Sequence, residues 1–120
     1  MLNILITFYS LVNGIDPNLA FKIARIESNM NPNAISKTND GGIFQLNNRY
    51  YRFHNPSWVF LPHTNIALAL RTLGTLKNKC SHTEQDSFVI CYNLGVSGAK
   101  KIKRPFKNNY YVKIKSMWRL

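Results

Sequence analysis

The chain has 120 residues, which is enough for one domain with a single hydrophobic core that needs no disulfide or metal for its stability. It contains no repeats or low-complexity linkers, which excludes a repeat array or a string of small domains. Its 16 Lys and Arg residues outnumber its 5 Asp and Glu residues, and the net charge of +11 favours polyanionic partners such as nucleic acid, lipid headgroups or bacterial cell wall.

Residues 2–12 form the first apolar segment. They are too few to span a bilayer, no basic residue precedes them, and residues 13–16 do not form a small-residue cleavage site. We therefore expect a core helix that ends at Gly14, and no signal peptide. If the protein acts outside the membrane, it would then have to cross it by another route, such as a phage holin, a virion or a specialised secretion apparatus.

The next segments predict a helix, a loop and a second short helix. Residues 17–28 have apolar side chains at helical spacing, with Asp16 as the N-cap and Pro17 in the first turn. Residues 29–42 hold four Asn, one Pro and two Gly, a composition typical of a structured loop. Residues 43–53 are apolar and aromatic, and a short helix there would place Gln45 beside a cleft.

The second half predicts three more helices. Residues 54–63 are a Pro-bounded connection, in which we expect Trp58 to pack in the core and not to stack on a sugar. Residues 65–79 carry the clearest apolar stripe. A capping-box pattern at residues 81–84 predicts the start of the next helix, which ends near Gly95, and residues 108–118 predict the last one.

The cysteines and histidines indicate no metal site. Cys80 and Cys91 are 11 positions apart on helices expected to form a hairpin, and this offset favours two buried thiols over a disulfide. His54, His63 and His82 lack the paired spacing of metal ligands and are expected on the surface or in loops.

Glu27 is the one acid of the five that lies inside an apolar periodic segment. In the last turn of a helix the dipole disfavours an anion, and partial burial acts in the same direction, so both favour the protonated carboxyl. The general acid of a glycosidase requires a carboxyl that is protonated near neutral pH. From its position alone, however, a solvated glutamate that ends a helix is the more common explanation.

The residues downstream of Glu27 reverse that balance. Short motifs follow Glu27 along the chain: Glu27-Ser28, Asn31-Pro32-Asn33-Ala34-Ile35-Ser36, Gly42-Ile43-Phe44-Gln45, Cys91-Tyr92-Asn93-Leu94-Gly95 and Tyr111-Val112. In their order and spacing they resemble the motifs of the soluble lytic transglycosylase domain, a family related to goose-type lysozyme. The resemblance spans residues 14–117. Phe44 and Cys91 replace the family's usual Met and Ala, which affects packing more than chemistry.

The resemblance implies a mainly α, lysozyme-like single domain over residues 1–120 and a role for each matched residue. Glu27 would be the catalytic acid and base. The matched residues expected to bind substrate or line the cleft are Ser36, Gln45, Tyr92, Asn93 and Tyr111. Tyr110 is adjacent to Tyr111, so a slip of one residue in this last match stays open.

Two reaction outcomes are compatible with this resemblance. In a transglycosylase, Glu27 protonates the oxygen between N-acetylmuramic acid and N-acetylglucosamine and then deprotonates the muramoyl C6 hydroxyl, which gives a 1,6-anhydro product. In a hydrolytic lysozyme a second carboxylate positions water, and the candidate is Asp40, about 6.5 to 9.5 Å from Glu27 if the enzyme inverts. Asp40 is equally explained as a turn residue. We favour the transglycosylase, acting as a monomer on peptidoglycan glycan strands without cofactor or metal.

The main alternative from another class is a nucleic-acid-binding module. Residues 100–120 contain 8 of the 16 basic residues and no acid, with Tyr110, Tyr111 and Trp118 interleaved. The chain shows no nucleic-acid fold signature, and a basic C-terminal region serves equally to bind anionic wall or envelope polymers. The ordered motifs favour the wall enzyme.

Overall fold

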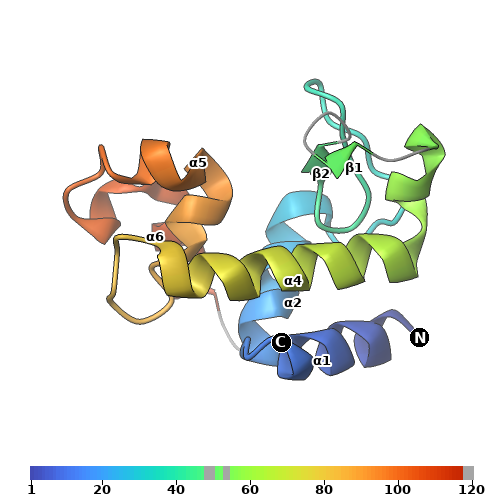
Figure 1. Ribbon diagram of the computed structural model, residues 1–120, viewed down its shortest axis with the longest axis horizontal. Helices are drawn as coiled ribbons and strands as arrows, with labels where there is room; N and C mark the ends of the chain where they lie inside the picture. The colour runs from blue at the N-terminus through green and yellow to red at the C-terminus, as the bar shows by residue number, and fades with distance from the viewer. Residues whose placement is uncertain (48–50, 53–54, 118–120) are drawn as a thin grey trace.

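The computed structural model describes residues 1–47, 51–52 and 55–117. Within them the architecture is mainly helical, with one small hairpin of two-residue strands. Figure 1 shows the long helix α4 (Pro62–Lys79) crossing the middle of the molecule, with α1 (Leu2–Val12) alongside it. The hairpin lies above one part of α4, and α5 (Val89–Ala99) and α6 (Asn109–Ser116) lie at the other end. The predicted mainly α, lysozyme-like class is confirmed.

The first two helices follow the sequence signals. In α1 the inward face carries Ile6 and Ser10. The helix ends at Val12 with Asn13 as its C-cap, and Gly14 follows with a φ of 70°, in the left-handed region. In α2 (Pro17–Ser28) the Asp16 side chain accepts a hydrogen bond from the Asn18 backbone N–H at 3.0 Å, which caps the helix as predicted.

The region after α2 is a loop that closes on a hairpin. Strand β1 (Asp40–Gly41) pairs antiparallel with β2 (Leu46–Asn47), in the register Asp40 to Asn47 and Gly41 to Leu46. The predicted short helix over 43–53 is therefore wrong for residues 43–47, where the chain turns and forms a strand. Gln45 has a φ of 52°, which no α-helix contains. Residues 48–50 and 53 of that prediction lie outside the described residues.

The segment before α4 corrects the prediction for Trp58. A 3-10 helix, η1 (Pro56–Phe60), buries Val59, whereas Trp58 is 42% exposed. The helix α4 then begins at Pro62, three residues earlier than predicted, because Pro at the first helical position needs no N–H partner. The buried stripe of α4 is as expected: Ile66, Leu70 and Leu73 are fully buried.

The segment between α4 and α5 overturns two predictions. No helix starts at residue 81; the chain is irregular until α5 begins at Val89. A local hydrogen bond competes with a helix there, because Ser87 Oγ donates to the Glu84 carbonyl at 2.6 Å. A distant one also fixes the loop, since His82 Nε2 bonds the Ala99 carbonyl at 2.9 Å.

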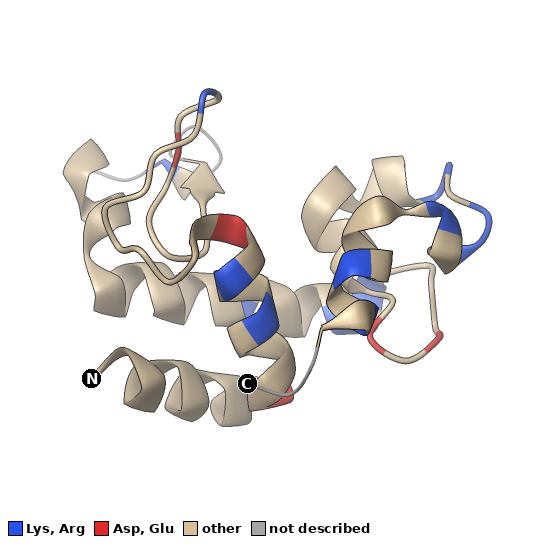
Figure 2. Cartoon of the chain, turned by 180° about the vertical axis from the view of Figure 1, so that it is seen from behind, with Lys and Arg blue, Asp and Glu red and all other residues tan. Residues whose placement is uncertain are grey.

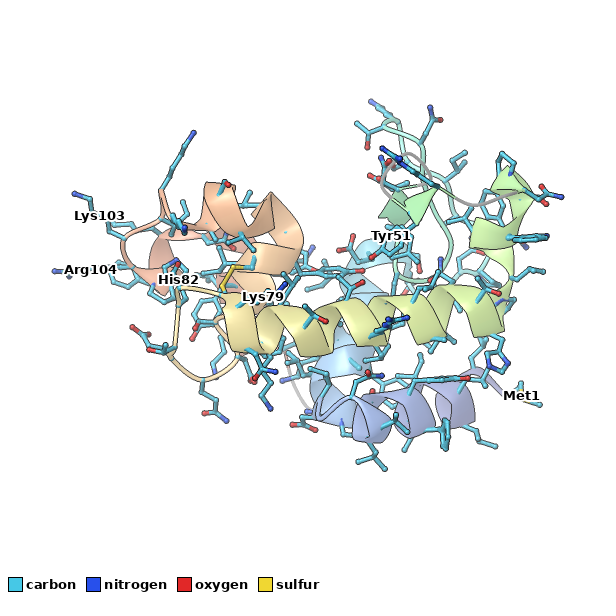
Figure 3. All side chains as sticks on the ribbon, in the orientation of Figure 1. Met1, Tyr51, Lys79, His82, Lys103 and Arg104 are labelled. Carbon is cyan, nitrogen blue, oxygen red and sulfur yellow. A yellow bond between two sulfur atoms is a disulfide. The ribbon has the colours of Figure 1, made fainter. Side chains whose placement is uncertain are left out.

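The same loop brings the cysteines together. Cys80 and Cys91 form a disulfide, with their Cα atoms 6.0 Å apart, so the expectation of two free thiols is wrong (Figure 3). The expectation assumed two regular helices in a hairpin, but Cys80 is extended and the loop turns back toward α5. The disulfide therefore ties the end of α4 to the first turn of α5.

The C-terminal part contains a break, a basic connection and a last helix. Gly95 interrupts α5 with a φ of 78°, whereas Gly98 continues the helix. The connection to α6 contains η2 (Pro105–Lys107) and is rich in lysine and arginine, as Figure 2 shows. In α6 the Asn108 side chain accepts from the Tyr111 N–H at 2.7 Å and so caps the helix. The predicted end of this helix at residue 118, with Trp118, lies outside the described residues.

Candidate active site

Glu27 lies at the end of α2, where two contacts fix the turn that follows. Ser28 Oγ donates to the carbonyl of Ile43 at 2.7 Å, which joins the helix end to the turn before β2. Asn29 and Met30 then adopt φ values of 55° and 64°, so the chain leaves the helix axis at once. The Glu27 side chain is thereby held at the junction of the helix and the hairpin region.

The environment of Glu27 raises its pKa from the ordinary value of 4.5 to about 7. Burial is the largest cause, because a partly buried carboxylate loses hydration. Tyr110 opposes this by donating its hydroxyl hydrogen to Glu27 Oε2 at 2.8 Å, and the negative charge of Asp40 raises the pKa further. Near neutral pH the carboxyl is therefore divided between its protonated and ionised forms.

A cleft of about 480 Å³ opens beside Glu27. One wall comes from the hairpin region and includes Asp40 and Gln45, and the opposite wall comes from α5 and includes Tyr92 and Asn93. The floor comes from α4. The cleft thus runs between the two ends of the molecule that α4 connects.

The α5 wall is attached to the hairpin region by a hydrogen bond. Tyr92 donates its hydroxyl hydrogen to the carbonyl of Phe44 at 2.9 Å. Burial, with the nearby charge of Glu27 as the second cause, raises the pKa of Tyr92 well above its usual range, so the phenol stays a neutral donor. Asn93 is exposed, and its Oδ1 accepts from Asn108 Nδ2 at 3.3 Å.

The hairpin wall is held by side chains that bond to its own backbone. Gln45 Nε2 donates to the carbonyls of Gly42 at 2.9 Å and Ala34 at 3.2 Å, which leaves the side-chain carbonyl oxygen for a ligand. Asn65 from α4 is fully buried behind this wall. It accepts from the Phe44 N–H at 2.9 Å and donates to the carbonyls of Gly41 and Val59 at 3.0 and 2.8 Å.

Asp40 is bonded within its own loop. Its Oδ2 accepts from Thr38 Oγ1 at 2.8 Å and from Ser36 Oγ at 3.3 Å, and its Oδ1 accepts from Asn47 Nδ2 at 3.0 Å. Ser36 does not line the cleft; its Oγ also accepts from the Asp40 N–H at 3.0 Å. Ser36 therefore supports the loop that carries Asp40 rather than facing the cleft.

Comparison with known protein families identifies the domain. The model of the transglycosylase SLT domain matches residues 4–117. The chain belongs to this family. For the SLT domain the family implies lytic transglycosylase activity on the glycan strands of cell-wall peptidoglycan. No curated protein sequence matches the chain significantly.

The match ends at residue 117 and so places the basic residues of the C-terminal third, apart from Arg119, within the SLT domain itself. A separate nucleic-acid-binding module in that third is therefore not needed to account for these basic residues.

Within the described residues, no group of His, Cys, Asp and Glu is arranged to hold a metal ion. No helix of the described part is both long enough and apolar enough to cross a membrane.

Of the two adjacent tyrosines of α6, the structure brings Tyr110 to Glu27. Tyr110, not Tyr111, bonds Glu27, whereas the Tyr111 hydroxyl donates to the Gln85 carbonyl at 3.3 Å. Adjacent residues of a helix point about 100° apart, so only one of the two can reach Glu27. The sequence left this slip open but gave no means to resolve it.

Two further features of the site were missed from the sequence. Asn65 stands next to the apolar stripe of α4, and a buried Asn there is a signal that its amide must bond backbone groups of a neighbouring segment. The contact of Tyr51 with Thr72, whose hydroxyl oxygens are 2.8 Å apart, had no signal in the sequence, because it joins two surfaces that only the tertiary fold brings together.

Proposed function

We propose that this SLT domain is a peptidoglycan lytic transglycosylase in which Glu27 is both the general acid and the general base. The observation that carries the proposal is the state of Glu27: a carboxyl at the cleft, with a pKa of about 7 caused mainly by burial. A carboxyl with this pKa can donate a proton at neutral pH and can also accept one, as a single residue with two successive roles must.

In the first step Glu27 donates its proton to the oxygen that links C1 of N-acetylmuramic acid to N-acetylglucosamine. The C1–O bond breaks, the N-acetylglucosamine leaves with the new O–H, and positive charge develops at C1 of the muramoyl ring. In the second step the Glu27 carboxylate takes the proton of the C6 hydroxyl, and O6 bonds to C1. The product is a 1,6-anhydro-muramoyl end, no water is consumed, and Glu27 is protonated again.

The neighbours of Glu27 support this sequence of proton transfers. The Tyr110 hydroxyl donates to Oε2, so it stabilises the carboxylate that forms after the first step and orients the carboxyl group. We assign binding of the sugars to Gln45, Tyr92 and Asn93, which line the cleft from both walls. Ser36 is assigned an indirect role, through the loop of Asp40.

The hydrolytic alternative requires Asp40 to position water. Both of its carboxylate oxygens already accept hydrogen bonds inside the hairpin loop, from Thr38, Ser36 and Asn47. This arrangement favours a structural role for Asp40 and therefore favours the transglycosylase outcome over the lysozyme outcome.

Mass spectrometry of the muropeptides released from isolated peptidoglycan tests the proposal. We expect ends that carry 1,6-anhydro-muramic acid, and Glu27→Gln should release none of them while keeping its fold. Reducing muramic acid ends would establish a lysozyme instead and return Asp40 to the mechanism. Retained release by Glu27→Gln would refute the role of Glu27 in either reaction.

A further inference from the structure

A second groove adjoins the cleft along α4. Its volume is about 350 Å³, and it shares part of its wall with the cleft, including Tyr51, Thr72 and Val96. The remaining wall comes from α4 and includes Arg71, Thr75 and Lys79. We call this the α4 groove. Figure 3 labels two of its lining residues, Tyr51 and Lys79.

The periodicity of α4 explains how one helix builds this groove. Residues four apart lie above one another on a helix face, so Leu68, Thr72 and Leu76 form one row. Arg71, Thr75 and Lys79 form the adjacent, more exposed row. The groove therefore has an apolar and hydroxyl row beside the cleft and a row with two cations outside it.

The charge of the groove is positive and uncompensated. None of its lining residues is acidic, and neither Arg71 nor Lys79 forms an ion pair with any residue that the structure describes. Guanidinium and ammonium groups that are exposed in this way bind carboxylates readily, the guanidinium in a bidentate manner. The groove thus offers a site for an anionic ligand with small aliphatic parts.

We propose that the α4 groove binds the acidic peptide stem that the muramic acid residues of the glycan strand carry. This inference rests on the proposed function, since it requires the glycan to lie in the cleft beside Glu27. A stem is attached to the sugar as a side branch and carries free carboxylates. Because cleft and groove share a wall, a branch from a sugar in the cleft reaches the groove along the surface of α4. The carboxylates then meet Arg71 and Lys79, and the alanine methyl groups meet Leu68 and Leu76.

The test compares two soluble glycan strands, one with intact stems and one whose stems an amidase has removed. We expect a KM about three- to tenfold lower for the stem-bearing strand, as two partly exposed charge contacts would give. In Arg71→Gln/Lys79→Gln this preference should disappear, with kcat on the stem-bearing strand unchanged. The matched control is Lys100→Gln/Lys101→Gln, which removes the same charge from the connection before η2 and should keep the preference.

Equal KM values of the wild type for the two strands would overturn the inference. Equal loss of preference in both double variants would also overturn it, because the effect would then be one of net charge. If neither strand is cleaved, the proposed function fails, and binding decides the inference separately. In that case the free stem peptide is titrated into the isotope-labelled protein; NMR shifts at Arg71 and Lys79 support the groove, and their absence at millimolar peptide refutes it.

Discussion

The raised pKa of Glu27 predicts that replacing this residue stabilises the protein, and only at higher pH. A rise from 4.5 to about 7 on folding corresponds to roughly 3 kcal/mol of unfavourable free energy once the carboxyl is ionised. The folded state binds the proton more tightly than the unfolded state does. The contribution of Glu27 to stability is therefore fully present below about pH 4.5 and is lost as the pH rises through about 7.

Glu27→Gln removes this pH dependence and keeps the hydrogen bond, because the amide oxygen still accepts from the Tyr110 hydroxyl. We expect the variant to match the wild type at about pH 4 and to exceed its free energy of unfolding by about 3 kcal/mol at about pH 8.5. The assay is denaturant unfolding of both proteins across this range. Glu84→Gln makes the same chemical change at an exposed position and should leave the pH dependence of the wild type in place. A difference between Glu27→Gln and the wild type that stays constant with pH would refute the raised pKa of Glu27.

Three other variants test the surroundings of the site. Tyr110→Phe removes the hydrogen bond that lowers the pKa of Glu27, so the alkaline limb of the pH–rate profile should move to higher pH. An unchanged limb would mean that Tyr110 does not affect the pKa of Glu27. Cys80→Ser/Cys91→Ser opens a loop of 11 positions. Loss of this constraint on the unfolded chain should lower the free energy of unfolding by about 3 kcal/mol and the melting temperature by about 10 °C. Equal melting temperatures in calorimetry would show that the disulfide does not stabilise the fold. Asn65→Ala removes the side-chain hydrogen bonds to three buried backbone groups. It should cost roughly 3 to 5 kcal/mol in the same unfolding assay, whereas a loss below about 1 kcal/mol would mean that water replaces the amide.

The features that sequence patterns predicted well are local ones. The α2 helix, its Asp16 cap and the position of Glu27 in the last turn depend on residues within a few positions of one another. The raised pKa was predicted in the right direction, and burial is its largest cause.

The features that the sequence did not predict depend on distant contacts. The choice between Tyr110 and Tyr111 depends on the rotation of α6 against α2, which no local pattern encodes. The disulfide depends on the path of an irregular loop whose capping-box pattern suggested a helix. The turn at Gln45 is stabilised by tertiary hydrogen bonds around Asn65, which override the helical tendency of the apolar residues nearby.

The hydrogen bond between Tyr110 and Glu27 joins residues 83 positions apart. Contacts of such separation form only after a long loop has closed, so they come late in folding. While the ribosome is still synthesising the chain, α2 can already be present, but Glu27 is then an ordinary glutamate in water, ionised at neutral pH. We therefore expect the raised pKa of Glu27 to be absent from a nascent chain and to appear only once the folded chain buries this carboxyl.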